Sequence, residues 1–130
     1  MVLDTSAVIA ILAGEPERAR FVALLAGAAD PLISAATLLE CSIVMLARTG
    51  PAGVKDLDAL LAAAGVRCVA VDQPQTVLAR EAFARFGKGR APAALNFGDC
   101  FAYALANAAG EPLLFKGEDF SKTDIQPAAT

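Results

Sequence analysis

Four acidic residues in this sequence stand among apolar neighbours or at the ends of apolar runs. They are Asp4, Glu40, Asp99 and Asp119. A carboxylate that leaves water must be paired or must bind a cation. Two carboxylates about 4 Å apart repel each other by about 4 kcal/mol at an effective dielectric constant near 20, and a divalent cation removes that repulsion. If the fold brings these four side chains together, they predict a metal site.

The absence of histidine restricts the chemistry of such a site. None of the 130 residues is a histidine, which excludes a Ser-His-Asp triad, a Cys-His pair and an imidazole acid–base relay. A site built from carboxylate oxygens favours Mg²⁺ or Mn²⁺ over Zn²⁺. A metal-activated water that attacks phosphorus needs no histidine. The residue types therefore predict Mg²⁺- or Mn²⁺-dependent chemistry on a phosphate group.

The first two acids also have purely structural interpretations. Asp4 could be the N-cap of a helix that begins near Ser6. Glu40 could complete a capping box with Thr37, in which it only accepts a backbone N–H. If Ser34 is the cap instead, Glu40 lies well inside the helix among apolar side chains. The sequence leaves both possibilities open.

The other two acids have similar alternatives. Asp99 could be a first-turn acid stabilised by the helix dipole, with Asn96 as the cap. Asp119 could be an ordinary turn residue. The adjacent Glu118 competes with Asp119 for any role at this position.

Apolar patterning indicates how these residues are positioned. Short apolar runs predict four buried strands at residues 1–4, 31–35, 67–71 and 112–115. Helical spacing of apolar residues predicts helices at 15–28, 36–48, 54–65, 75–87 and 98–110. Strands that alternate with helices and lack period-two alternation are typical of a parallel sheet covered on both faces. Ligands of such sheets bind beyond the carboxyl ends of the strands, where Asp4 and Asp119 are expected.

Length and composition indicate one compact domain. We expect it to span residues 1–126, followed by a short tail at 127–130 that is frayed after Ile125. The content of hydrophobic residues, 56%, supports a full core, whereas the longest uncharged run, 100–110, is too short to span a membrane. With no signal peptide visible either, we expect a cytoplasmic protein. The three cysteines are expected to be small core residues.

One segment carries a local excess of positive charge. Residues 80–90 contain Arg80, Arg85, Lys88 and Arg90 against a single acid. Although the whole chain has a net charge of −3, the placement of charge matters more for RNA binding than the total. The segment is either an RNA-binding surface, with Arg85, Lys88 and Arg90 as contacts, or a solvated helix face with a basic loop.

Four sequence blocks together resemble the PIN-domain family. They are "VLDTSAVIAIL" at the start, "LLEC" at 38–41, "LNFGDCFAYALA" at 95–106 and "LLFKGEDFSKTDI" at 113–125. Within that family the sequence is most similar to VapC-type toxins of bacterial toxin–antitoxin pairs. The resemblance runs from Val2 to Ile125, with the four blocks in order.

The resemblance implies a three-layer α/β/α sandwich on a central parallel sheet. It also implies an endoribonuclease, dependent on Mg²⁺ or Mn²⁺, that is held inactive by a VapB-type antitoxin and forms a homodimer. The family acids fall on Asp4, Glu40, Asp99 and Asp119. The supporting polar positions fall on Thr5, Ser6 and Asn96, with Glu118 as the alternative fourth acid.

Two other classes of function remain open. A phosphoacceptor domain, receiver-like or dehalogenase-like, also places an aspartate at a strand end near Mg²⁺. The dehalogenase pattern requires a second aspartate where this chain has Ser6, and a receiver requires paired acids where Thr5 follows Asp4. A non-catalytic regulatory binding module is the second alternative.

Overall fold

The computed structural model describes residues 1–89 and 92–128, in which short strands alternate with helices. The elements in chain order are β1 (Val2–Leu3), α1 (Thr5–Leu12), α2 (Arg18–Ala26), β2 (Leu32–Ser34), α3 (Ala35–Thr49), α4 (Pro51–Ala63), β3 (Arg67–Val69), α5 (Gln73–Phe86), α6 (Phe97–Ala109) and β4 (Leu113–Leu114). Each strand and helix expected from the apolar pattern has a counterpart among them.

The four strands form one parallel sheet in the order β3-β2-β1-β4. Val2 of β1 pairs with Leu32 on one side and with Leu113 on the other. Neighbouring parallel strands have their carboxyl ends at the same edge of a sheet. The chain therefore leaves β1 at Asp4 and leaves β4 toward Asp119 on that common edge.

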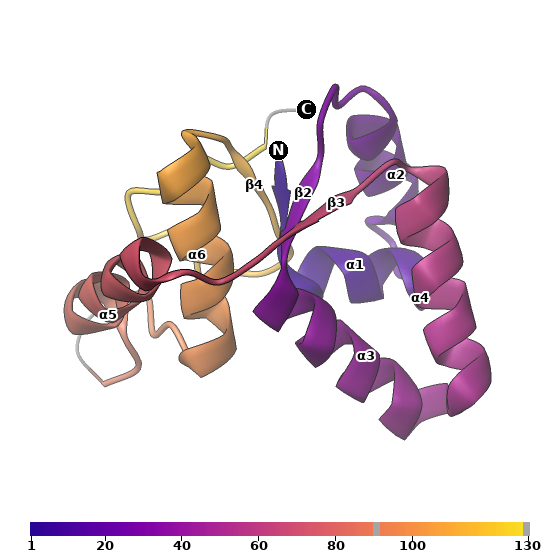
Figure 1. The fold of residues 1–130 in the computed structure, drawn as a ribbon, viewed down its shortest axis with the longest axis horizontal. Helices are drawn as coiled ribbons and strands as arrows, with labels where there is room; N and C mark the ends of the chain where they lie inside the picture. Colours follow the sequence, from indigo (N-terminus) through magenta and orange to yellow (C-terminus); the bar gives the residue numbers. More distant parts are fainter. Residues whose placement is uncertain (90–91, 129–130) are drawn as a thin grey trace.

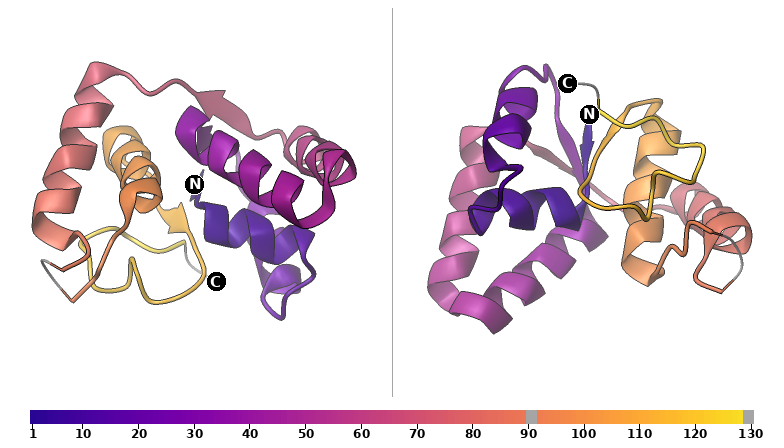
Figure 2. Two further views of the ribbon diagram at one scale, coloured as in Figure 1. Left: turned by 90° about the horizontal axis from the view of Figure 1, so that it is seen from below. Right: turned by 180° about the vertical axis from the view of Figure 1, so that it is seen from behind.

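Helices cover both faces of the sheet (Figure 1). Helices α5 and α6 lie on one side, and α1 to α4 lie on the other. The views from below and from behind show the same separation, with the segment after β4 running beside α6 (Figure 2). This arrangement is a three-layer α/β/α fold, and it confirms the predicted fold class.

The two faces of the sheet contribute to two separate cores. Leu3 and Leu114 are buried in the cluster that also contains residues of α1, α2, α3 and α4. Their neighbours Val2 and Leu113 are buried in the cluster that contains residues of α5 and α6. This division follows from the alternation of side chains along a strand. In the described part of the chain, no helix has the length and apolar character needed to span a membrane.

Local signals fix the ends of several helices. The Ser34 hydroxyl accepts a hydrogen bond from the Ala36 N–H at 3.3 Å, so Ser34 is the N-cap of α3. Asp72 caps α5 in the same way, accepting from the Gln75 N–H at 2.9 Å. Helix α6 ends at Gly110, whose φ of 64° is a left-handed conformation that glycine adopts readily.

Strand β3 differs from the prediction, because it is not buried. Arg67 and Cys68 are exposed, and Arg67 forms an ion pair with Asp30 at 2.9 Å. Strand β3 lies at one edge of the sheet beside β2, whereas β4 at the other edge is buried and also pairs with residues 126–128. The expectation that all three cysteines belong to the core is therefore wrong for Cys68, while Cys41 and Cys100 are buried.

The segment 126–128 lies against the sheet. The Leu113 N–H donates to the Gln126 carbonyl at 2.9 Å, and the Ala128 N–H donates to the Leu113 carbonyl at 2.8 Å. The expectation of a frayed chain after Ile125 is thus wrong for these three residues. Their attachment to β4 adds backbone pairing at the outer edge of that strand.

Candidate active site

Asp4 lies directly after β1 and is the N-cap of α1. Its Oδ2 accepts hydrogen bonds from the Ser6 N–H at 3.0 Å and from the Ser6 hydroxyl at 2.6 Å. The Ser6 hydroxyl in turn accepts from the Lys116 N–H at 2.9 Å, which ties the end of β1 to the segment after β4. The side chain is only 3% exposed. Asp4 is therefore a helix cap, and it also lines the pocket described below.

Glu40 lies in the second turn of α3 and is not part of a capping box, since Ser34 caps this helix. Its Oε1 accepts a hydrogen bond from the Thr5 hydroxyl. Its carboxylate also lies against Gly98 in the first turn of α6, where a Cβ atom would overlap it. The absence of a side chain at Gly98 is what allows α3 and α6 to approach at this point.

Asp99 lies in the first turn of α6 and forms a capping box with Asn96. The Asp99 N–H donates to Asn96 Oδ1 at 2.9 Å, and the Asn96 N–H donates to Asp99 Oδ2 at 3.0 Å. The structural interpretation of Asp99 is thus correct as far as the helix terminus is concerned. The side chain is nevertheless buried, at 9% exposure, and borders the same pocket as Asp4.

The segment after β4 separates the roles of the two adjacent acids. Glu118 accepts a hydrogen bond from the Ser121 hydroxyl at 3.0 Å within a local turn. Asp119 lines the pocket, whereas Glu118 is not among the residues that line it. On geometry, Asp119 is the better candidate for the fourth acid.

One open pocket of about 450 Å³ brings the four candidate acids together at the carboxyl edge of the sheet. Thr5, Ser6 and Asn96 also line it. Within residues 1–89 and 92–128, however, no three acidic, cysteine or histidine side chains are already arranged as ligands of one metal ion. The carboxylates thus surround a space rather than converge on one point.

Electrostatic coupling shows that the four acids share one environment. The pKa of Asp99 is raised to about 7, chiefly by burial. The backbone N–H of Asn96 opposes this shift, while the charges of Asp4, Asp119 and Glu40 add to it. Burial also raises the pKa of Asp4, against the hydrogen bonds from Ser6 and together with the charge of Glu40.

The buried cysteines near the site are not nucleophiles. Burial raises the pKa of the Cys41 thiol to about 12 and that of Cys100 to about 11. A cysteine nucleophile reacts as the thiolate, which these pKa values disfavour at neutral pH. The chemistry of the pocket therefore belongs to its carboxylates.

Three charged residues of the pocket were not predicted from the sequence. They are Glu15, Arg48 and Lys116. Arg48 could have been found from its spacing, because residues 40, 44 and 48 follow one another at i, i+4 and i+8 along α3. Glu15 and Lys116 are brought to the pocket by tertiary contacts that leave no local pattern.

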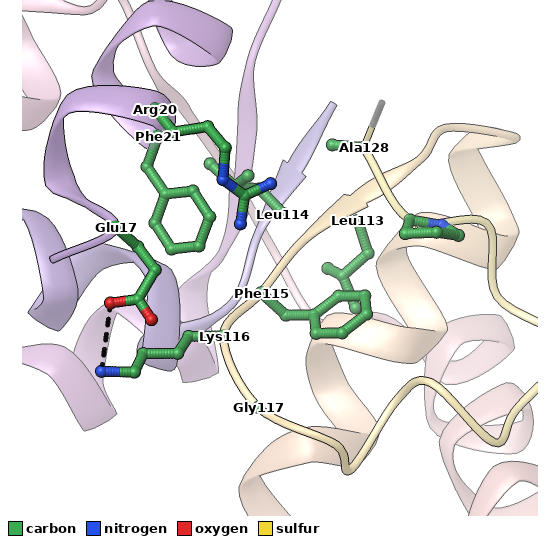
Figure 3. Close-up of a pocket in the computed structure, with 10 residues that line it drawn as sticks. Glu17, Arg20, Phe21, Leu113, Leu114, Phe115, Lys116, Gly117 and Ala128 are labelled. Carbon is green, nitrogen blue, oxygen red and sulfur yellow. Dashed lines mark ion pairs between the residues drawn. The ribbon is translucent and has the colours of Figure 1, made fainter. Parts of the chain in front are cut away.

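Lys116 is held by ion pairs beside the pocket. Its Nζ lies 2.7 Å from Glu15 Oε1 and 3.3 Å from Glu17 Oε1. Figure 3 shows the pair with Glu17 next to a neighbouring cavity, where Arg20 is drawn over the ring of Phe21. Both carboxylates come from the segment between α1 and α2, so Lys116 joins that segment to the one that carries Asp119.

Arg85 and Lys88, two of the predicted RNA-binding residues, do not line the pocket. Arg85 forms an ion pair with Asp124 at 3.3 Å and lies over the ring of Phe86. Lys88 is exposed and forms no ion pair with any residue in the described ranges. Arg90 lies outside the described residues.

Comparison with known proteins gives a consistent result along the whole chain. Residues 1–126 match the PIN domain family. Ribonuclease VapC30 of Mycobacterium tuberculosis is 49% identical over 129 residues, which cover 99% of this chain and 98% of that protein. A Ribonuclease VapC of Mycolicibacterium smegmatis is 51% identical over 129 residues, with 96% and 97% coverage.

Solved structures support the same fold at lower sequence identity. The crystal structure of the M. tuberculosis toxin VapC20, described as cleaving the sarcin–ricin loop, aligns with a TM-score of 0.77 at 21% identity and covers 95% of each chain. A toxin–antitoxin complex from Klebsiella pneumoniae aligns with a TM-score of 0.71 at 18% identity, covering 95% of this chain and 92% of that one. From the family match and the full-length similarity to these ribonucleases, the chain belongs to the PIN domain family, among the VapC ribonucleases.

Proposed function

We propose that this protein is an endoribonuclease dependent on Mg²⁺ or Mn²⁺, and that it is the toxin of a type II toxin–antitoxin pair. The observation that carries the proposal is the single pocket lined by Asp4, Glu40, Asp99 and Asp119. The charges of the other three acids add to the burial that raises the pKa of Asp99. Uncompensated repulsion of this kind destabilises a folded protein, and a bound divalent cation relieves it. Membership of the VapC ribonucleases supports RNA as the substrate.

The donor set of the pocket fits a hard divalent cation. All four acids offer carboxylate oxygens, the ligand type that Mg²⁺ and Mn²⁺ prefer, and the chain has no histidine to favour zinc. Asp4, Glu40, Asp99 and Asp119, which all line the pocket, would hold the ion. Because the carboxylates surround the space without converging, small side-chain movements must accompany binding.

The protein's own groups have distinct tasks in this proposal. Bound divalent metal would supply an activated water and neutralise charge on the phosphate. Ser6 orients Asp4 through two hydrogen bonds, and Thr5 orients Glu40. Asn96 holds Asp99 at the start of α6. These positioning contacts keep the ligand carboxylates at fixed places on the rim of the pocket.

The experiment that tests the proposal measures cleavage of labelled RNA by the purified protein. We expect cleavage with Mg²⁺ or Mn²⁺, none in EDTA, and recovery when the metal is added back. Incubation with acetyl phosphate serves as the second arm. Full activity in EDTA would contradict the metal site, and a stable phosphoprotein without RNA cleavage would favour a phosphoacceptor domain. Neither reaction would favour a binding module.

Two partners belong to the same proposal. A cytoplasmic ribonuclease needs an inhibitor, so we infer a VapB-type antitoxin, which could place an arginine between two of the carboxylates. We also infer a homodimer, because α3 exposes a line of apolar side chains. Leu39 is 61%, Ile43 56% and Leu46 50% exposed.

Whether Arg85, Lys88 and Arg90 contact RNA stays a prediction.

A further inference from the structure

Two cations line the pocket that otherwise carries only negative charge. Its acidic lining residues are Asp4, Glu15, Glu40, Asp99 and Asp119, and its basic ones are Arg48 and Lys116. RNA brings a phosphate charge with every nucleotide, so an acidic pocket repels the strand on both sides of the scissile bond. A divalent cation offsets this repulsion only at the scissile phosphate. A flanking phosphate therefore needs a protein cation at the rim.

Lys116 is poorly suited to that role, because its positive charge is already neutralised by ion pairs. Its ammonium group forms ion pairs with Glu15 and Glu17, and the pair with Glu17 is visible in Figure 3. The group of three side chains has a net charge of −1. To bind a phosphate, Lys116 would have to leave two carboxylates unneutralised beside an already acidic pocket.

Arg48 is in the opposite situation. Its side chain is exposed and has no hydrogen bond, ion pair or ring contact with any other residue of the ranges 1–89 and 92–128. It lies on α3 eight residues beyond Glu40, which places its Cα about 12 Å along the helix axis. Val44, between them, lines the same pocket, so the three residues extend the pocket along α3.

The position of Arg48 has a simple structural explanation that does not involve the pocket. It lies in the last turn of α3, where a positive charge interacts favourably with the helix dipole. That interaction requires only a positive charge near the carbonyl end of the helix. The dipole explanation does not account for the position of the side chain at the border of the pocket. It also does not account for the choice of arginine, whose planar guanidinium can donate two parallel hydrogen bonds to phosphate oxygens.

We propose that Arg48 binds the non-bridging oxygens of a phosphate that flanks the scissile phosphate, and so fixes the position of the RNA strand along α3. This inference rests on the proposed ribonuclease function. It assigns to Arg48 the binding and positioning of substrate, with no part in the bond-breaking step. RNA is favoured over a protein partner because the free cation belongs to the pocket that would receive the scissile phosphate.

The test measures RNA binding separately from cleavage. The probe is a single-stranded RNA oligonucleotide that the wild-type protein cleaves, and binding is measured in an Asp99→Asn background to prevent turnover. Arg48→Ala should raise Kd by about 3- to 10-fold at moderate salt. It should also reduce the slope of log K against log salt by roughly 0.7. Arg48→Lys should restore the slope but only part of the affinity.

Lys55→Ala is the matched control, because Lys55 is an exposed cation on the adjacent helix α4 and does not line the pocket. It should change neither Kd nor the salt slope beyond error. The contact itself is located with oligonucleotides that carry one neutral methylphosphonate linkage each. At one flanking position the neutral linkage should weaken binding by the native Arg48 protein and have no effect with Arg48→Ala.

The possible results separate this inference from the function on which it rests. If the wild-type protein cleaves no RNA, the proposed function fails and the inference fails with it. If it cleaves RNA but Arg48→Ala binds with an unchanged Kd and slope, only the inference is overturned. A defect of Arg48→Ala confined to antitoxin binding would likewise overturn it, and would assign Arg48 to the protein interface.

Discussion

Asp4 and Asp99 each stabilise a helix N-terminus while they border the pocket. Asp4 accepts the Ser6 N–H at the start of α1, and Asp99 accepts the Asn96 N–H at the start of α6. A helix N-terminus carries partial positive charge, which favours the ionised carboxylate. Burial acts against ionisation, and for both residues it is the larger effect. The site therefore keeps its acids fixed in place at an electrostatic cost.

Replacing either aspartate by asparagine should remove catalysis and leave the fold intact. At position 4, asparagine is as good an N-cap as aspartate. At position 99, its amide oxygen can still accept the hydrogen bond from the Asn96 N–H. We expect RNA cleavage by Asp4→Asn or Asp99→Asn to fall by roughly 100-fold or more. Circular dichroism should remain unchanged. Wild-type rates in either variant would contradict a role of that carboxylate in the reaction.

The stability of the metal-free protein should depend on pH through Asp99. Its folded-state pKa of about 7 lies above the ordinary value of 3.8, so the folded state holds the proton more tightly. The resulting stability is present below about pH 4 and is lost as the pH rises to about 7. In EDTA at pH 8, Asp99→Asn should therefore melt roughly 2–6 °C above the wild type.

Near pH 4 the difference between these two proteins should disappear. Mg²⁺ at pH 8 should raise the melting temperature of the wild type more than that of Asp99→Asn. The variant lacks one carboxylate ligand for the ion, and it also lacks the charge whose repulsion the ion would relieve. Equal melting temperatures of the two proteins at pH 8 in EDTA would show that ionised Asp99, buried near the other carboxylates, does not destabilise the folded protein.

At this scale the sequence predicts the acids better than the cations. The candidate acids could be recognised because a carboxylate among apolar residues, as at Asp4, is unusual in itself. Arg48 sits in an ordinary helix terminus, where a basic residue is expected, so only its spacing of eight residues from Glu40 could have indicated it. Lys116 reaches the pocket only because β4 lies beside β1 in the folded sheet.

Helices α3 and α6 meet where Glu40 lies against Gly98. A Cβ atom at position 98 would overlap both oxygens of the Glu40 carboxylate. The atoms in conflict are the far end of a flexible side chain, so an alanine can be accommodated if Glu40 moves. Such a movement would displace one of the four acids and break its contact with Thr5.

We therefore expect Gly98→Ala to lower activity without unfolding the protein. The displacement of Glu40 should reduce the cleavage rate by roughly 10- to 100-fold. Stability should be nearly unchanged, because alanine favours the helix more than glycine does. Gly27→Ala is the matched control, since a Cβ atom there would make only ordinary contacts of 3.6 Å or more. If both variants have wild-type activity, the position of Glu40 is not critical.

Most elements follow from apolar periodicity and cap residues, and the exceptions have a physical cause. Strand β3 was expected to be buried as part of an apolar run, yet Arg67 and Cys68 are exposed at the sheet edge. Edge or centre is decided by strand order, which no local pattern contains. Pairing of 126–128 with β4 depends in the same way on contacts between distant segments.

For the whole molecule, the parallel sheet explains why residues from opposite ends of the chain share one pocket. Strands β1 and β4 are neighbours, so Asp4 and Asp119 leave the sheet at the same edge, while α3 and α6 bring Glu40 and Asp99 from its two faces. The family resemblance implied this meeting of four acids. The apolar pattern placed only Asp4 and Asp119 at that edge.

Regulation belongs to this scale, because the antitoxin inferred above would act on the pocket as a whole. We expect co-expression with the cognate antitoxin to give a tight complex with suppressed RNA cleavage. If an antitoxin arginine inserts between the carboxylates, Asp4→Asn and Asp99→Asn should weaken the complex, as measured by calorimetry. Unchanged affinity in both variants would mean that the antitoxin covers the pocket without inserting a charge.

The central claim is that the carboxylates of this pocket hold a divalent cation that supplies the attacking water. The most direct measurement identifies the ends of the RNA products. Hydrolysis by water leaves a 5′-phosphate and a 3′-hydroxyl, and a 2′-deoxy substitution at the scissile nucleotide should not prevent cleavage. We predict these ends in Mg²⁺ or Mn²⁺ and no products in EDTA. A 2′,3′-cyclic phosphate product, or cleavage that requires the 2′-hydroxyl, would contradict the account.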